Sequence, residues 1–234
     1  IHIYFARLFG IKTIFINANL YPGSSRLRFG LKSFNRLIFH QFNLILTGSE
    51  NLKKRILNLA PKSIVKVTGD SRFDQVIQRA KDNNKKLLPN IFKKSNNIIL
   101  GSTVDSDLPI LSSALDILGS NFFNNDTKLI IVPHEINEND LLPIEKLLST
   151  KGLSYQRLSE FNKSEPFQVL IVNSVGMLAD LYSYAKIAYV GAGFSTGVHS
   201  VIEPAVYKCI VSYGPNIEIL DEAIEMNQNG AGII

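Results

Sequence analysis

The stretch that decides the fold is residues 189–204, which read YVGAGFSTGVHSVIEP. A β-branched and aromatic run leads into a loop with three glycines, Gly191, Gly193 and Gly197, and the loop leads into a helical pattern. Glycines let backbone amides approach a ligand closely, and a helix amino terminus offers unpaired N–H groups and a positive dipole end. This strand–loop–helix unit predicts an α/β fold with a cradle for a phosphate or a carboxylate.

The glycine spacing is not that of a dinucleotide fingerprint, because the third glycine of Gly-x-Gly-x-x-Gly is absent. The loop also lacks the lysine of a P-loop. His199 and Glu203 are four residues apart and would share one face of a helix. Glu203 could then accept hydrogen bonds from the two hydroxyls of a ribose, while His199 donates to an anion. From the loop alone, a tight turn before a capped helix with a solvated glutamate is an equal alternative.

Apolar runs with little alternation recur along the chain, which is typical of strands buried on both faces of a parallel sheet. We expect strands at residues 13–17, 44–47, 64–68, 98–101, 129–133, 169–172, 187–190 and 210–212. We expect helices at 31–41, 52–59, 109–118, 138–149, 177–185, 200–207 and 218–225, with Ser49 and Asn216 as two of the amino-terminal caps. Repeated strand–helix alternation predicts doubly wound parallel sheets.

Residues 79–97 are polar and basic, which favours an interdomain connection, with a long frayed surface helix as the alternative. We therefore expect the end of an amino-terminal Rossmann-like domain at 1–75, a connection at 76–96 and a carboxyl-terminal Rossmann-like domain at 97–234. The chain starts at Ile1 rather than Met and ends as an apolar strand begins. We expect a fragment whose first domain is incomplete.

Composition narrows the class of protein. Hydrophobic residues make up 45% of the 234 residues and charged residues 19%, enough apolar material for a real core. The single cysteine, Cys209, excludes an internal disulfide and favours a reducing compartment. The net charge of +5 suits an anionic partner or simply a lysine-rich surface. Scattered basic residues argue against nucleic acid, and no apolar run approaches the roughly 20 residues of a membrane span.

Three further loops follow predicted strands: residues 101–107 (GSTVDSD), 132–138 (VPHEINE) and 173–178 (NSVGML). Hydroxyls and amides of the first could hold an anion, or Ser106 or Asp107 could cap the next helix. The second has a single imidazole, His134, and is therefore not read as a metal site. Because parallel strands present their carboxyl ends along one edge, we expect all four loops to converge there.

These four loops, in this order, resemble those of the 3-deoxy-D-manno-octulosonic acid (Kdo) transferases. Ser102 and Thr103 match the family's Ser-Thr loop, and residues 132–136 resemble its Val-Pro-Arg-His-Pro-like loop. Residues 173–178 resemble its Asp-Thr-Met-Gly-Glu-Leu segment, and 197–204 its Gly-Gly-His-Asn-Pro-Leu-Glu-Pro segment. Residues 17–19, 24–26, 68–74 and 214–216 also resemble family motifs, so the likeness covers essentially the whole chain. The Pro-His-Glu-Ile and Tyr-Val-Gly-x-Gly-Phe forms resemble the variant of Bacteroidetes-type enzymes.

The resemblance implies a GT-B fold with two Rossmann-like domains and an inverting transfer of Kdo from CMP-Kdo to lipid A or its precursor in lipopolysaccharide core synthesis. It implies work at the cytoplasmic face of the inner membrane, peripheral or anchored through the amino terminus, without a cofactor or metal and without nucleic acid. It makes no prediction of oligomeric state. Two alternatives stay open: another GT-B enzyme that uses a UDP-sugar, and a catalytically inactive membrane-surface binding protein with the same fold.

The resemblance also implies site residues. The donor-binding set is Ser102, Thr103, Pro133, His134, Glu135, Gly176, Met177, Leu178, Gly197, His199, Ser200 and Glu203, and the acceptor side holds Asn17, Ser24, Ser25 and Arg26. The general base, a carboxylate near the start of the first domain, is expected outside this chain, so we expect donor binding without catalysis. Four positions depart from the family pattern and leave open a shifted donor or reduced activity: His134 for arginine, Asn173 for aspartate, Met177 for glutamate and Ser200 for asparagine.

Overall fold

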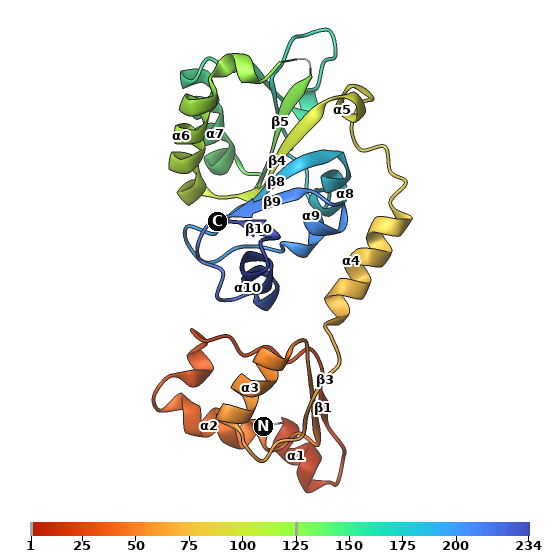
Figure 1. Ribbon diagram of the computed structural model, residues 1–234, viewed down its shortest axis with the longest axis vertical. Helices are drawn as coiled ribbons and strands as arrows, with labels where there is room; N and C mark the ends of the chain where they lie inside the picture. Colours follow the sequence, from red (N-terminus) through yellow and green to blue (C-terminus); the bar gives the residue numbers. More distant parts are fainter. Residues whose placement is uncertain (1, 125) are drawn as a thin grey trace. The chain divides into compact units, whose positions relative to one another are not determined.

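The computed structural model describes residues 2–124 and 126–234, which form two compact units (Figure 1). Unit 1 comprises the residues up to Gln75 together with Glu218–Asp221, and unit 2 comprises Val76–Ile217 and Glu222–Ile234. Both units combine helices with a parallel sheet, which confirms the predicted α/β class. The domain boundaries and the connection at 76–96 given above stay a prediction.

Unit 1 holds a three-stranded parallel sheet in the order β1-β2-β3. Its strands are β1 (Ile14–Phe15), β2 (Leu44–Thr47) and β3 (Val65–Val67), and its helices are α1 (His2–Leu8), α2 (Leu31–Phe39), α3 (Glu50–Leu59) and the short η1 (Ser25–Leu27). Ser49 caps α3 as predicted, because its side chain accepts a hydrogen bond from the amide of Leu52. Ile45 and Ile56 lie at the centre of a buried apolar cluster.

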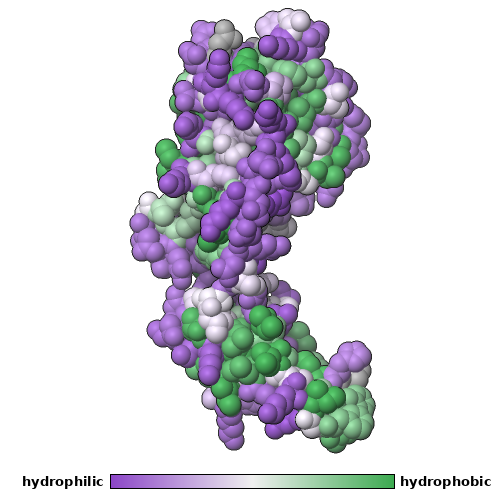
Figure 2. All heavy atoms as spheres, turned by 90° about the vertical axis from the view of Figure 1, so that its right-hand side faces the viewer, coloured by the Kyte–Doolittle hydropathy of each residue, from purple (hydrophilic) through white to green (hydrophobic). Residues whose placement is uncertain are grey.

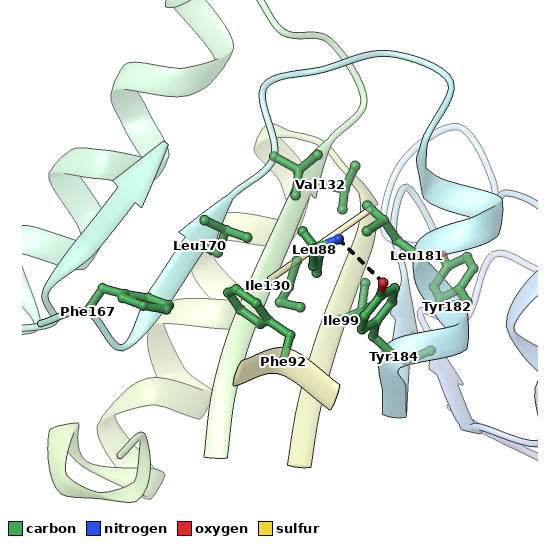
Figure 3. Close-up of a cluster of buried hydrophobic side chains, with 12 residues drawn as sticks. Leu88, Phe92, Ile99, Ile130, Val132, Phe167, Leu170, Leu181, Tyr182 and Tyr184 are labelled. Atoms are coloured by element: carbon green, nitrogen blue, oxygen red, sulfur yellow. Dashed lines mark hydrogen bonds between the residues drawn. The ribbon is translucent and has the colours of Figure 1, made fainter. Parts of the chain in front are cut away.

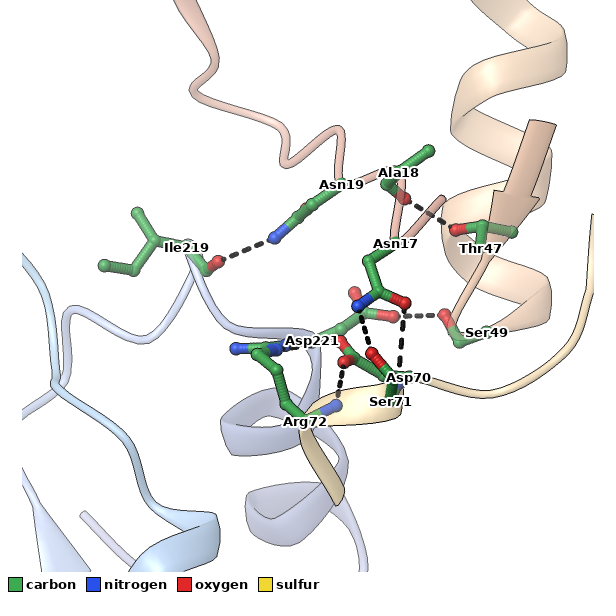
Figure 4. Close-up of polar contacts among 10 residues, drawn as sticks. All are labelled: Asn17, Ala18, Asn19, Thr47, Ser49, Asp70, Ser71, Arg72, Ile219 and Asp221. Carbon is green, nitrogen blue, oxygen red and sulfur yellow. Dashed lines mark hydrogen bonds and ion pairs between the residues drawn. The ribbon is translucent and has the colours of Figure 1, made fainter. Parts of the chain in front are cut away.

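A segment from late in the chain completes unit 1 (Figure 4). The carboxylate of Asp221 accepts hydrogen bonds from Ser49 and, at 2.8 Å, from NH1 of Arg55. Asn19 donates to the carbonyl of Ile219 at 3.5 Å. The α3 end of unit 1 is therefore held by residues about 170 positions away in the chain.

Unit 2 is built on a seven-stranded sheet in the order β10-β9-β8-β4-β5-β7-β6, and every pairing in it is parallel. The strands are β4 (Asn96–Thr103), β5 (Thr127–Pro133), β6 (Tyr155–Arg157), β7 (Val169–Ile171), β8 (Ala185–Val190), β9 (Ile210–Tyr213) and β10 (Gly232–Ile233). Its helices are α5 (Ile91–Lys94), α6 (Leu108–Leu118), α7 (Glu138–Thr150), α8 (Leu178–Leu181) and α9 (Ile202–Val206), with η2 (Asp105–Asp107), η3 (Ser120–Phe122), η4 (Leu158–Glu160) and η5 (Tyr182–Tyr184) between them. Two further helices, α4 (Ser71–Asp82) and α10 (Asp221–Gln228), begin in unit 1 and continue in unit 2.

The central strands of unit 2 are buried on both faces, as their lack of alternation predicts. Ile99 and Ile130 face one apolar cluster, together with Phe92 and Tyr182 (Figure 3). Their neighbours Leu100, Leu129 and Ile131 face a second cluster, which α6 and α7 close with Leu115, Leu141, Ile144 and Leu148. The sheet is therefore the middle layer of three.

The eight predicted strands are all confirmed, whereas several helix limits differ from the prediction. The helix expected at 177–185 is divided into α8 and η5, and it ends at Tyr184 because β8 begins at Ala185. The helix expected at 218–225 begins at Asp221, so Asn216 is not its cap. Instead Asn216 joins two loops: its amide donates to Gly193 O at 2.9 Å, and its carbonyl accepts from the amide of Val198 at 3.0 Å. The strand β6 and the helix α1 were not expected.

Candidate functional site

The four loops singled out from the sequence leave β8, β4, β5 and β7, which are consecutive neighbours in the sheet. All of these strands are parallel, so the loops meet at the carboxyl edge of unit 2. The chain runs from β4 to β5 on one side and later returns to β8 on the other side of β4. The loops after β4 and β8 therefore diverge at a topological switch point, where ligands of open α/β sheets bind.

Asp107 fastens the loops after β4 and β8 to each other. Its buried carboxylate accepts hydrogen bonds from the amides of Val104 at 2.9 Å and Ala192 at 3.1 Å, and from the hydroxyl of Tyr189 at 2.7 Å. The amide of Gly191 adds a bond of 2.8 Å to the carbonyl of Gly101. Asp107, which the sequence suggested only as a helix cap, is therefore the main polar link of the switch point.

Glycine is needed at position 191 because the two loops pack backbone against backbone. A Cβ there would lie 2.2 Å from the carbonyl oxygen of Ser102 and 2.7 Å from Oδ2 of Asp107. Ser102 itself adopts a positive φ of 53°. The loop is therefore held in one shape by close packing rather than left open as a flexible glycine loop.

Two hydroxyls at this edge are buried without a partner among the described residues: Oγ1 of Thr103 and Oγ of Ser106. Thr103 is 4% exposed. Buried polar groups in native proteins are nearly always hydrogen-bonded. Both hydroxyls therefore have unused capacity to bind a ligand or water next to the loop that Asp107 holds.

His134 and His199 come together across β4. Their rings stack, with centroids 4.6 Å apart and an angle of 19° between the planes. The amide of His134 donates to the carbonyl of Thr103 at 2.9 Å, which fixes the loop after β5 against the loop after β4. Burial lowers the pKa of His199, the nearby His134 lowers it further, and the charge of Asp107 opposes both effects. The exposed Glu135 lies beside them, with Oε1 3.9 Å from Nε2 of His134.

The expectation that His199 and Glu203 share one helix face is wrong. The helix α9 begins only at Ile202. Residues 198 and 199 precede it, because their amides donate to carbonyls outside the helix: Val198 to Asn216 at 3.0 Å and His199 to Gly191 at 3.4 Å. The pKa of Glu203 is raised by burial, lowered by the charge of Arg79 and raised by that of Asp180. Glu203 thus responds to a different set of charges from His199.

Asp180, Arg79 and Lys85 form an ion cluster beside the loop after β7. The buried Asp180 carboxylate accepts from Nε of Arg79 at 2.7 Å and from Nζ of Lys85 at 2.8 Å. Arg79 also donates to the carbonyl of Gly176 at 3.4 Å. The bond to Arg79 is the first cause that lowers the pKa of Asp180, although burial opposes it. Sequence reasoning missed this cluster, whose only local sign is an aspartate inside an apolar helix.

The remaining predicted donor residues have mainly backbone or packing contacts. Gly176 and Gly197 adopt positive φ angles of 77° and 119°. Met177 and Leu178 pack against the apolar cluster under the sheet. Pro133 is buried at the end of β5, and Ser200 is half-buried before α9. The switch point gathers Ser102, Thr103, His134 and His199, whereas Gly176, Met177 and Leu178 lie beside the Asp180 cluster.

The predicted acceptor residues all lie in unit 1. Asn17 donates to Oγ of Ser71 at 2.7 Å (Figure 4). Ser24 caps η1 by accepting from the amide of Arg26, and NH1 of Arg26 donates to the carbonyl of Asn19 at 3.4 Å. Ser25 opens η1 and is exposed. Asn17, Ser24 and Arg26 thus already make hydrogen bonds within unit 1, and the role of all four residues toward an acceptor stays a prediction.

The described residues hold no grouped metal ligands and no helix that could span a membrane. Over residues 2–124 and 126–234, no three His, Cys, Asp or Glu side chains are grouped as metal ligands. Over the same residues, every helix is too short or too polar to cross a bilayer. The absence of a metal or cofactor from the reaction remains an expectation.

Comparison with known proteins agrees with the resemblance read from the motifs. Residues 2–75 match a family model described as 3-deoxy-D-manno-octulosonic-acid transferase. A 3-deoxy-D-manno-octulosonic acid transferase of Chlamydia trachomatis serovar A is 26% identical over 232 residues, which cover 96% of this chain and 52% of the relative. The chain thus spans about half the length of that relative.

Solved structures agree on the fold. The C-terminal CMP-Kdo binding domain of WaaA from Acinetobacter baumannii is 19% identical, with a TM-score of 0.50 over 70% of this chain and 80% of that domain. A putative UDP-N-acetylglucosamine 2-epimerase from Listeria monocytogenes is 12% identical, with a TM-score of 0.64 over 99% of this chain and 57% of the epimerase. The predicted GT-B fold with two Rossmann-like parts is confirmed.

Proposed function

Since the chain is related to the Kdo transferases over almost its whole length, we propose that it acts in the transfer of Kdo from CMP-Kdo to lipid A or its precursor, with inversion at the sugar. The observation that carries this proposal is the gathering of hydroxyl and imidazole groups at the switch point of unit 2. The donor has one phosphate and one sugar carboxylate. Both are anions that hydrogen-bond donors of this kind recognise.

Each part of the donor has candidate partners in unit 2. The unpartnered hydroxyls of Thr103 and Ser106 offer hydrogen bonds to phosphate or carboxylate oxygens. His134 and His199 offer ring N–H groups. Glu203 is a half-buried acceptor for paired ribose hydroxyls; burial raises its pKa, and the nearby charge of Arg79 opposes that shift. The leaving CMP would gain stabilisation from fixed donors as its negative charge develops.

Unit 1 supports the second part of the proposal, a lipid acceptor at a membrane surface. Apolar side chains gather on the unit that carries α1 and α2 (Figure 2). The exposed members are Tyr4, Phe5, Leu8, Phe9, Phe29, Phe34 and Leu37. Basic residues are interspersed with them, at Arg7, Lys12, Arg28, Lys32 and Arg36. Apolar side chains mixed with basic ones favour the interface of an anionic membrane, in accord with the inner-membrane face implied by the resemblance.

Calorimetric titration of the chain with CMP, UDP, GDP and CMP-Kdo tests the donor assignment. We expect the cytidine ligands to bind more tightly than UDP and GDP. Glu203→Ala should weaken CMP by at least about a hundredfold, because two hydrogen bonds to a carboxylate are lost and each is worth about 1.5–3 kcal/mol. Glu165→Ala is the matched control, because Glu165 is exposed in the segment before β7, at the opposite edge of the sheet.

The outcomes of this titration are distinct. A preference for UDP would indicate that the donor is a UDP-sugar rather than CMP-Kdo, and that the chain has another GT-B activity. Equal weakening of CMP by Glu203→Ala and Glu165→Ala would remove the ribose role of Glu203. Sedimentation with vesicles tests the membrane surface: we expect binding to vesicles with anionic lipid, reduced by Phe34→Glu, and equal binding to neutral vesicles would contradict the basic contribution.

A further inference from the structure

The stacking of His134 on His199 is a feature that the proposed function does not by itself require. The two rings come from loops on opposite sides of β4 and lie 4.6 Å apart, nearly parallel. Among the described residues, neither imidazole makes a hydrogen bond through a ring nitrogen, and the His134 side chain is 46% exposed. The pair therefore presents unused N–H or N groups at the carboxyl edge, where the His134 amide is also bonded to the carbonyl of Thr103.

Stacking at this distance makes the charge of one ring depend on the other. Two imidazolium rings so close repel each other, so protonation of both is disfavoured in the free protein. The charged groups that face the pair are Glu135, 3.9 Å from His134, and Asp107, whose charge acts on His199. Burial and the neighbouring His134 nevertheless lower the pKa of His199, which favours the neutral form of this ring.

We infer that the His134–His199 pair couples donor binding to proton uptake, by holding an anionic group of the ligand most tightly when the pair is protonated. This inference rests on the proposed function for the location of the donor. A bound phosphate or carboxylate supplies the negative charge that the pair lacks and raises its proton affinity. Protons are then taken up on binding, and ligand affinity falls as pH rises, by up to about tenfold per pH unit for each proton.

The test is calorimetric titration of the chain with CMP, UDP, free Kdo and CMP-Kdo from pH 5.5 to pH 8.5. At pH 7 the titration is repeated in two buffers of different ionisation enthalpy, which counts the protons taken up. His134→Arg replaces a titratable cation with a permanent one, and His134→Gln keeps a donor without charge. His2→Gln, at an exposed position in α1, is the matched control.

For the wild type and His2→Gln we expect a mean uptake of about 0.7 proton and a fall in affinity of about tenfold between pH 6.5 and pH 8. For His134→Arg we expect little pH dependence over that range and about tenfold tighter binding than wild type at pH 8. His134→Gln should bind weakly at every pH. CMP has a phosphate that itself titrates near pH 6. The inference is therefore tested by the difference in pH dependence of affinity between wild type and His134→Arg.

Free Kdo and CMP distinguish the two anions that could meet the pair. A pH dependence seen with Kdo assigns the carboxylate, and one seen only with CMP assigns the phosphate. Wild type and His134→Arg with the same pH profile would overturn the inference, as would no binding of any probe across the range. CMP-Kdo binding without proton uptake would overturn the coupling and leave the proposed function standing. A preference for UDP that is accompanied by proton uptake would overturn the proposed function and leave the proton coupling standing.

Discussion

Asp107 offers the sharpest test of how the switch point is held together. Its carboxylate is 3% exposed and accepts from the hydroxyl of Tyr189 on Oδ1 and from the amides of Val104 and Ala192 on Oδ2. Asp107→Ala leaves all three donors without this acceptor. A buried donor left unsatisfied costs about 1–3 kcal/mol, so we expect a loss of about 4 kcal/mol in the free energy of unfolding of unit 2.

Asp107→Asn is the matched control. An amide oxygen in place of Oδ2 can accept from both backbone amides, and the amide nitrogen can donate to the oxygen of Tyr189 once that hydroxyl turns its proton away. Only the charge of the acceptor is lost, so we expect about 1–2 kcal/mol. Tyr189→Phe removes the Oδ1 contact alone and should cost about 1 kcal/mol.

Urea denaturation followed by circular dichroism gives the three stabilities, with separate transitions fitted for the two units. Amide hydrogen exchange at Val104 and Ala192 reads the same contacts locally. Exchange at both amides should be fastest in Asp107→Ala and only modestly faster in Asp107→Asn. If the alanine and asparagine variants lose the same stability, the carboxylate acts through its charge rather than through these three bonds.

Two other changes test the packing and the charge of the same edge. Gly191→Ala should cost about 3 kcal/mol or more, because its Cβ would meet the Ser102 carbonyl and the Asp107 carboxylate; Gly176→Ala meets no atom within 4 Å and should cost only about 1 kcal/mol for its positive φ. Thermal melts that rank these two alike would contradict the backbone contact. Glu203→Gln should raise the stability of unit 2 at pH 7 and leave it unchanged near pH 4. Burial raises the pKa of Glu203 above its ordinary 4.5, so its contribution to stability is present below that value and is lost as pH rises through the folded pKa. Denaturation at the two pH values checks the sign, and a variant less stable than wild type at pH 7 would refute it.

The sheet of unit 2 was predictable because its strands are buried on both faces. Residues 128–133 of β5 are all buried, and such a run leaves a strong apolar signal in the sequence. The strand β6 gave no such apolar signal, because Tyr155–Arg157 is a half-buried edge strand with polar residues. The helix α1 was missed for a related reason. Its apolar residues are mostly exposed, and none of its described residues is buried, so their spacing reflects no core.

The site was predictable only as far as local sequence reaches. The convergence of four loops followed from parallel strands, and the structure brings those loops to one edge. The start of α9 did not follow, because it depends on the carbonyl of Asn216, which engages Val198 before the helix begins. The bonds of Asp107 to Ala192 and of Arg79 to Asp180 join residues 85 and 101 positions apart. No local pattern indicates such contacts.

The departures from the family pattern differ in what they change. Asn173 donates to Oγ of Ser159 at 2.7 Å and accepts from the amide of Ser159 at 3.1 Å. An aspartate could keep both contacts with the Ser159 hydroxyl donating instead, so this departure changes the local charge rather than the contacts. Met177 packs on the apolar cluster, where an ionised glutamate would be costly to bury.

His134 is different, because its side chain is exposed and stacks on another titratable ring instead of serving a structural contact. The buried links of Asp107 and Gly191 keep the loops in place whatever stands at position 134. A change from a permanent cation to an imidazole therefore leaves the fold intact. Under the inference made above, its effect falls on how the charge offered to the ligand depends on pH.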